Sequence, residues 1–437
     1  IVFGDWSSDV CSSDLLLSGI AALFLLMRVA KASLGEAGLL AMAVWAISIP
    51  PIYFSNELKQ YGTDAMIVLL LLFLAQACLK DSTRLRNFIF LGIAGALALW
   101  ISHPSAFILA AIGIVIFIEK ITGNIKTPYT WIFSLGAAWA LSFAVEYLVS
   151  LQYLVANEFL QGYWKKAFMP FPPWSNKRWF LNTYFYLVSI TTNTTDWTLG
   201  ITLAILALVG ALSLVFRHRS FGLILILSFA MTGLASALQK YPLRDRFMLF
   251  LAPLFILLIA EAIGFLYRVS HKLFPRLALV LPVLASLFIL SYITSGLSIL
   301  SEPITRAEIK PVMAYVGKNI QPGDRIYVYY TSVTSFLYYA PFYGIDSDNA
   351  FLGFRTAIKR EALDAFYDEV DSLRGQGRVW FVFADIVDCG GCDGDMYEYY
   401  GNYLDTLGVR LQSVNSLSAS GYLYDLRLQD GAIKSAP

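Results

Sequence analysis

The residues best suited to chemistry gather in the stretch 53–66, YFSNELKQYGTDAM, which joins two long apolar runs. If this stretch is helical, four of its polar residues recur at i, i+3, i+4 and i+7 and share one face: Glu57, Gln60, Tyr61 and Asp64. Lys59 points off that face. A polar stripe at the edge of a membrane segment costs free energy unless it is solvated, paired or used. We therefore predict that the chemistry of the chain lies beside this stripe.

A histidine occupies a second helix start, in the sequence Ser102-His103-Pro104. Proline suits the first helical turn, serine can cap it, and a helix N-terminus favours anions. His103 could therefore bind a phosphate, ligate a metal or pass a proton. A histidine that only caps a helix at an interface fits the same pattern equally well.

Two basic segments complete the set of residues that could bind an anion. Lys165 and Lys166 lie in YWKKAFMPFPPW, where aromatic rings alternate with cations as in a chain lying in the membrane interface. A packed loop with an aromatic belt is the alternative. Arg244 and Arg246 lie in YPLRDR, and arginine recognises phosphate through paired donors. There the alternative is an Arg–Asp pair that anchors a helix end.

The composition identifies the elements that must position these residues. The 437-residue chain is 57% hydrophobic and 14% charged, with a mean hydropathy of +0.62, whereas soluble domains are about 25% charged. Roughly ten runs reach membrane-spanning length: 15–32, 36–54, 62–79, 87–102, 104–119, 128–150, 199–216, 220–238, 246–267 and 277–299. A net charge of +1 without a basic stripe indicates no nucleic-acid partner.

The basic residues orient these predicted helices. Lysine and arginine follow the first, third, fifth, seventh and ninth helices, so these loops share one face, which the positive-inside rule places in the cytoplasm. The candidate residues and everything after 301 then lie on the outer face. Lys165, Lys166, Arg244 and Arg246 are positive charges on that face and indicate an anionic partner there.

The last third of the chain differs in composition. Strands such as 325–330 and 378–384 alternate with predicted helices, which indicates a small α/β domain over 301–437. Cys389 and Cys392 lie in DCGGCDGD. We expect a loop disulfide outside the cytoplasm; a metal loop and a redox motif are the alternatives.

Residues 5–15, DWSSDVCSSDL, fit no signal peptide and resemble translated sequencing adapter. We therefore treat 1–15 as non-native, expect the native start to be missing, and assign no role to its acidic residues or its cysteine.

The layout resembles the GT-C superfamily of integral-membrane glycosyltransferases, in particular protein O-mannosyltransferases and lipid A aminoarabinose transferases. The resemblance rests on SNELKQYG, SHPSAF, PLRDRFMLFLAP, QPGDRIYVYY and RVWFVF. It implies a polytopic helical membrane domain over 16–300 and an extracytoplasmic α/β domain, in the inner or plasma membrane. It also implies transfer of a sugar from a polyprenyl-phosphate donor to a protein, lipid or glycan acceptor.

The resemblance carries over to only a few residues. Glu57 and Tyr61 match the family's second external loop, with Asp64 on the same stripe; Arg244 and Arg246 match a basic loop near the lipid phosphate. Lys59, Lys165 and Lys166 are further candidate phosphate-binding residues, and His103 has a plausible place. The family's acidic first external loop, which serves as base or holds a divalent metal, would fall in the missing part.

Two other functions compete with this one. A transporter or flippase places ionisable residues near the bilayer midplane, whereas the charges here gather at helix ends. A non-catalytic protein that binds membrane lipid or glycan is the third hypothesis, and the intact upstream sequence would discriminate it from an enzyme.

Overall fold

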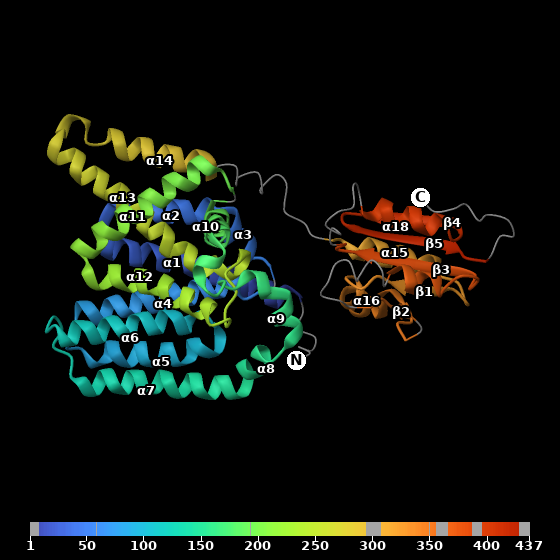
Figure 1. Cartoon of the computed structure of the whole chain (residues 1–437), viewed down its shortest axis with the longest axis horizontal. Coiled ribbons are helices and arrows are strands. Elements are labelled where there is room, and N and C mark those ends of the chain that lie inside the picture. Colours follow the sequence, from blue (N-terminus) through green and yellow to red (C-terminus); the bar gives the residue numbers. More distant parts are fainter. Residues whose placement is uncertain are drawn as a thin grey trace. The chain divides into compact units, whose positions relative to one another are not determined.

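The apolar runs of the first three hundred residues fold into a helical unit (Figure 1). The structure is a computed structural model and describes residues 8–57, 59–192, 194–293, 307–348, 350–354, 366–386 and 396–427. The chain divides into two compact units, 1–303 and 304–437. The helices of the first unit are α1 (Ser8–Leu34), α2 (Gly38–Ile47), α3 (Ile49–Phe54), α4 (Tyr61–Lys80), α5 (Leu85–Ile101), α6 (Ser105–Ile121), α7 (Tyr129–Glu146), α8 (Gln152–Val155), α9 (Glu158–Trp164), α10 (Lys177–Thr192), α11 (Trp197–Arg217), α12 (Arg219–Ala237), α13 (Ala252–Leu273) and α14 (Val280–Ile293).

Among the described residues, six stretches are long and apolar enough to cross a membrane: Asp14–Ile47, Tyr61–Lys80, Tyr129–Val155, Trp197–Arg217, Arg219–Ala237 and Asp245–Leu273. They confirm the prediction of a mainly helical chain with membrane-spanning segments. Helices α5 and α6, which the sequence also predicted as spans, have 17 residues each. That length falls just short of the roughly 20 residues that an untilted span requires.

Helix α13 is the centre of the first unit. Every residue from Ala252 to Gly264 is buried, and all of them except Glu261 are apolar or glycine, as expected of a helix surrounded by others. Its principal neighbours are α11 and α2. A Cβ atom at Gly210 of α11 would lie 1.8 Å from the carbonyl oxygen of Leu258, so the two helices approach at a distance that only glycine permits.

The predicted helix 36–54 is interrupted at Ser48. The Ser48 backbone is extended, with φ −73° and ψ 130°, and its hydroxyl donates a hydrogen bond to the carbonyl of Val44 (2.6 Å). Pro50 and Pro51 follow, and they lack the N–H groups that a continuous helix would require. The chain therefore changes direction and places α3 next to the start of α4.

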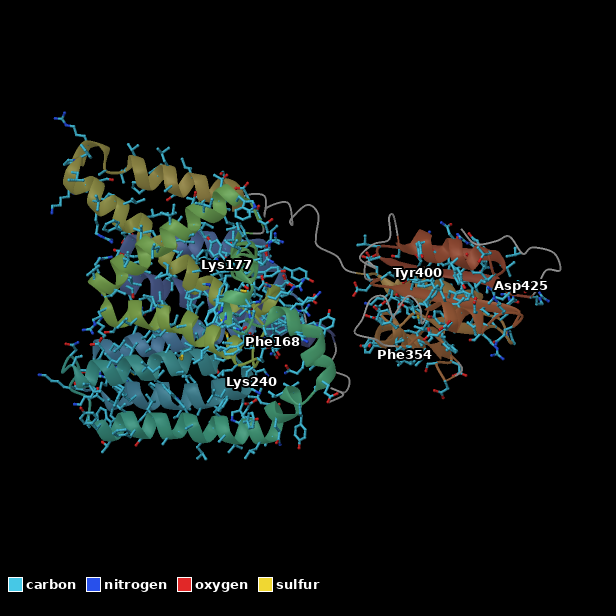
Figure 2. The ribbon with its side chains drawn as sticks, in the orientation of Figure 1. Phe168, Lys177, Lys240, Phe354, Tyr400 and Asp425 are labelled. Atoms are coloured by element: carbon cyan, nitrogen blue, oxygen red, sulfur yellow. The ribbon has the colours of Figure 1, made fainter. Side chains whose placement is uncertain are left out.

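The segment between α7 and α11 contains one further long helix, α10. Its buried residues include Trp179, Leu187 and Val188, and it contacts α3, α13 and the 3-10 helix η5 (Asp245–Leu251). Both predicted alternatives described this segment as a chain without a long helix, so α10 was not predicted from the sequence. Figure 2 shows Phe168, Lys177 and Lys240 at the same end of the first unit.

The second unit is a five-stranded sheet with helices on both faces. Its strands are β1 (Arg325–Val328), β2 (Ala350–Leu352), β3 (Arg378–Ala384), β4 (Val409–Ser416) and β5 (Ala419–Asp425), in the order β2-β1-β3-β5-β4. β1 pairs in parallel with β2 and β3, whereas β5 is antiparallel to β3 and β4. Its helices include α15 (Ile309–Asn319), α16 (Val333–Tyr339) and α18 (Met396–Asp405), and residues 366–371 are helical as well.

The apolar run RVWFVFA becomes the central strand β3 because both faces of the sheet are covered. Trp380 and Val382 pack against the residues of α15 and α16, whereas Phe381 and Phe383 pack against Tyr400 of α18. The predicted α/β character of this region is confirmed, and the sheet is mixed.

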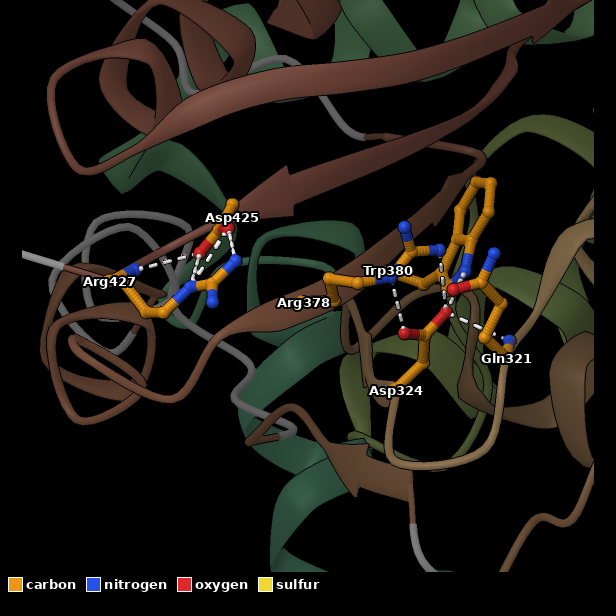
Figure 3. Close-up of polar contacts among 6 residues, drawn as sticks. All are labelled: Gln321, Asp324, Arg378, Trp380, Asp425 and Arg427. Atoms are coloured by element: carbon orange, nitrogen blue, oxygen red, sulfur yellow. Dashed lines mark hydrogen bonds and ion pairs between the residues drawn. The ribbon is translucent and has the colours of Figure 1, made fainter.

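Asp324, in the turn before β1, ties the start of β1 to the start of β3 (Figure 3). Its carboxylate accepts hydrogen bonds from Arg378 Nε (2.6 Å) and Nη2 (3.1 Å), from Trp380 Nε1 (3.2 Å) and from the backbone N–H of Gln321 (3.0 Å). Burial acts to raise the pKa of Asp324, but these donors, led by Arg378, outweigh it and lower the pKa below its usual value.

Asp324→Asn is therefore expected to destabilise the sheet at neutral pH by about 1–3 kcal/mol. The folded-state pKa is depressed, so the contribution of the carboxylate is present above its unfolded pKa of about 4 and is lost as the pH falls. Hydrogen exchange of β3 amides in the full chain should show faster exchange at pH 7 and a flatter pH dependence below pH 5. Asp368→Asn, at an exposed position, is the control; equal protection in both variants would contradict the assignment.

Candidate active site

The predicted polar stripe is only partly helical. Helix α4 begins at Tyr61, and Glu57 lies in the turn before it, so Glu57 and Asp64 do not share a helical face as predicted. Hydrogen bonds within the turn explain why the helix does not extend back to Glu57. Ser55 Oγ (2.7 Å) and Asn56 Nδ2 (3.1 Å) both donate to the carbonyl of Ile52, and such local bonds compete with helix formation.

Tyr61 and Asp64 remain one turn apart on α4, and Asp64 is buried with 3% of its surface exposed. Its Oδ1 atom has no hydrogen-bond partner among the described residues. The Ser102 side chain interacts with the carboxylate, although its Oγ also lacks a hydrogen bond of normal geometry. A carboxylate this deep in a membrane helix is costly unless it serves a function.

Glu57 and Lys59 lie closer to the surface than Asp64. The Tyr53 hydroxyl donates a hydrogen bond of 3.0 Å to Glu57 Oε2, which fixes the Glu57 carboxylate on the turn. Lys59 is exposed, and its backbone N–H donates to the carbonyl of Glu57 (2.6 Å). These two residues therefore belong to the outer, more exposed part of the site, which we call its rim. Asp64 belongs to the buried part, which we call its floor.

His103 lies in the turn between α5 and α6, beside Ser102. Its Nδ1 atom is 3.6 Å from Glu146 Oε1, which is longer than a hydrogen bond, and the Glu146 side chain is only 4% exposed. Burial lowers the pKa of His103, so its imidazole is neutral at pH 7 and can accept a proton. The histidine therefore faces a carboxylate at the end of α7.

Glu146 is a site residue that the sequence analysis did not select. It is the last residue of α7, and the helix continues as a π-helical turn over Tyr147–Leu151. π-helical turns are frequent at functional sites. The signal in the sequence is a lone carboxylate within an apolar run, but its pairing with His103 depends on packing between α5, α6 and α7.

Arg246 joins the floor of the site from η5. Its guanidinium carbon lies 5.6 Å from the centre of the Tyr61 ring and 5.9 Å from that of Phe247, and its Nε atom is buried without a hydrogen-bond partner among the described residues. Of the two predicted arginines, Arg246 therefore keeps a donor available. The contact with Tyr61 connects η5 to α4.

Arg244, unlike Arg246, pairs with a neighbouring carboxylate. Its Nε donates to Asp245 Oδ2 at 3.1 Å, the Arg–Asp pair that the sequence analysis weighed against phosphate binding, and its guanidinium carbon lies 5.5 Å from the centre of the Tyr186 ring. The Arg244 side chain is 45% exposed. It lies on the rim and retains its other nitrogen atoms for solvent or ligand.

Tyr241 packs between these residues and is fully buried. Its hydroxyl donates a hydrogen bond of 2.9 Å to the carbonyl of Phe247. Burial, followed by the nearby charges of Asp64 and Tyr61, raises the pKa of Tyr241 well above its usual value. The phenol is therefore protonated at any physiological pH.

Lys165 and Lys166 are exposed in the 3-10 turn Lys165–Ala167, directly after Trp164. The Trp164 ring centre lies 4.9 Å from that of Phe247, and the Ala167 carbonyl accepts a hydrogen bond from the N–H of Leu243 (2.9 Å). The two lysines are thus held beside the segment that carries Arg244 and Arg246.

The site concentrates buried polar atoms that lack hydrogen-bond partners among the described residues: Asp64 Oδ1, Ser102 Oγ, His103 Nδ1, Ser105 Oγ and Arg246 Nε. Each such atom costs about 1–3 kcal/mol when left unpaired. A polar ligand with both donors and acceptors would satisfy them. A carboxylate, a neutral imidazole and a guanidinium in one site can transfer a proton and stabilise an anion.

The described residues contain no group of three or more His, Cys, Asp or Glu side chains that could hold a metal ion. Cys389 and Cys392, the predicted disulfide, lie outside the described residues.

No protein-family model and no curated protein matches the sequence. Function is therefore inferred from the geometry of the site together with the resemblance noted for the sequence.

Proposed function

We propose that the chain is an integral-membrane glycosyltransferase that moves a sugar from a polyprenyl-phosphate donor to a hydroxyl group of a protein, lipid or glycan acceptor. The observation that carries this proposal is the group of unpaired buried polar atoms around Asp64, His103 and Arg246. A sugar offers many hydroxyl groups to such atoms, and its lipid phosphate offers an anion to the cations.

Arg246 is proposed to bind the donor phosphate. A guanidinium forms strong charge-assisted hydrogen bonds to phosphate, and the Nε atom of Arg246 is buried and available. Arg244, Lys165, Lys166 and Lys59 on the rim would attract the anion over a longer range, because exposed charges contribute more to encounter than to affinity.

Asp64 is proposed to act as the general base. The acceptor oxygen attacks the anomeric carbon of the sugar, and its proton passes to the Asp64 carboxylate. The bond between the anomeric carbon and the phosphate oxygen breaks, and the polyprenyl phosphate leaves with the bonding electrons. The cations stabilise the phosphate during this step. Tyr61 and the His103–Glu146 pair would position the two substrates.

The same proposal places the site on the outer face of the inner or plasma membrane, with the second unit extracytoplasmic. The support is the alternation of basic loops along the sequence. Lys80 ends α4, and Lys272 lies in the last turn of α13. These ends are opposite to the start of α4, with Tyr61 and Asp64, and to η5, which precedes α13.

Arg246→Gln is expected to weaken binding of the donor about ten- to a hundredfold, because one charge-assisted contact to phosphate is lost. Binding is measured with the purified chain in nanodiscs and a fluorescent polyprenyl-phosphate hexose. Arg219→Gln, an exposed cation at the start of α12, is the matched control and should bind as the unmodified chain does. If both variants bind donor equally well, Arg246 is only an anchor for η5 and the assignment is wrong.

A further inference from the structure

A cavity lies in the first unit, far from the candidate active site. It is bounded by the end of α1, the start of α2, the last turns of α13, and α14, and has a volume of about 630 Å³. Its walls are mainly apolar and include Leu34, Leu40, Ile263 and Val283, with Arg268 as the cation. Arg268 lies 16 residues along α13 from its first residue, which is about 24 Å at the rise of an α-helix.

At the polar end of this cavity, Arg268 belongs to a cluster of charged side chains. Glu261 is fully buried and accepts hydrogen bonds from Arg217 Nη1 (2.9 Å to each carboxylate oxygen), Arg268 Nη2 (2.6 Å) and the Ser213 hydroxyl (2.6 Å). Two guanidinium groups thus surround one carboxylate. These three side chains together carry a net charge of +1.

Arg268 has donors to spare on the cavity side. Its contacts to Glu261 and to Ser213 (3.2 Å) both use Nη2, and no hydrogen bond among the described residues uses its Nη1 or Nε. The Arg268 side chain is 33% exposed and lines the cavity. A free N–H of a guanidinium can donate a charge-assisted hydrogen bond to a phosphate oxygen.

We propose that this cavity binds an anionic glycerophospholipid, with one acyl chain against the apolar walls and the phosphate on Arg268. The apolar walls suit the acyl chain, and the remaining N–H donors of Arg268 suit the phosphate. Glu36 also lines the cavity and is exposed. Its carboxylate would repel a second negative charge, so a headgroup with a single negative charge, such as that of phosphatidylglycerol, fits best.

The test uses the delipidated full chain in a neutral detergent with fluorescent phosphatidylglycerol or phosphatidylcholine of identical acyl chains. The unmodified chain should bind phosphatidylglycerol at least about tenfold more tightly. Arg268→Gln should weaken phosphatidylglycerol binding about ten- to a hundredfold and remove the preference. Arg276→Gln removes a cation from the segment that follows α13 but is not in the cavity lining, and should keep the preference.

A second variant tests the cavity without touching the charges. Ser286→Trp introduces a large side chain into the cavity lining and should abolish binding of both lipids while Arg268 keeps its contacts. If Arg268→Gln fails to fold, Ser286→Trp still tests whether the lipid binds in this cavity. Three outcomes would each overturn the proposal. The unmodified chain could bind the two lipids equally well, the preference could survive in Arg268→Gln, or Ser286→Trp could bind both lipids as the unmodified chain does. None of these outcomes depends on glycosyltransferase activity.

Discussion

Asp64→Asn is expected to lower the rate of sugar transfer about 10²–10⁴-fold, the usual contribution of a general base. Asparagine has the shape of the aspartate but cannot take the acceptor proton. Donor affinity should change little, because the phosphate contacts of Arg246 are untouched. The measurement is kcat and KM for transfer from a defined polyprenyl-phosphate sugar as a function of pH.

The control for Asp64 is Glu57→Gln, at the rim of the site. Glu57 is held by Tyr53, and its replacement should lower kcat by less than about tenfold, as expected of a group that positions rather than transfers a proton. A purely structural role of Asp64 would shift the midpoint of unfolding and leave the pH profile of kcat unchanged. That result would contradict its assignment as the base.

Glu261→Gln should destabilise the first unit by about 3–5 kcal/mol, because it leaves the Arg217 and Arg268 guanidinium groups without their buried counter-charge. Thermal unfolding of the purified chain in detergent measures the loss, and Glu36→Gln at an exposed position is the control.

Replacing the whole triad of Glu261, Arg217 and Arg268 by methionine should restore most of the stability lost in Glu261→Gln, since an apolar replacement removes the desolvation cost of all three charges together. If Glu261→Gln unfolds within about 1 kcal/mol of the unmodified chain, the triad is hydrated and does not hold α11 against α13.

The sequence predicted the parts of the fold that depend on local composition. Apolar runs of about twenty residues indicated the helices, and the continuous apolar run 378–384 indicated a strand of a small α/β domain. The interruption at Ser48 was missed, although Pro50 and Pro51 signal it. Strand β2 was missed because three partly exposed residues carry too little pattern.

The candidate site was predictable only in outline. Asp64, His103 and Arg246 were chosen because each is polar at the edge of an apolar run, and the structure brings them to one end of the first unit. Glu57 was placed on the wrong face because the turn at Ser55 and Asn56 competes with the helix. The approach of Glu146 to His103 spans 43 positions, and such long-range packing leaves no periodic signal in the sequence.

Photo-crosslinking of the donor tests the central claim most directly. A polyprenyl-phosphate hexose with a diazirine near the phosphate is irradiated with the purified chain in nanodiscs, and the labelled peptides are identified by mass spectrometry. We predict label in 61–64, 102–105 and 244–247 that excess unlabelled donor removes. The opposite result is label that unlabelled donor does not displace and that spreads over lipid-exposed positions such as Phe216, which is 87% exposed. That result would contradict the claim that 61–64, 102–105 and 244–247 form a donor site.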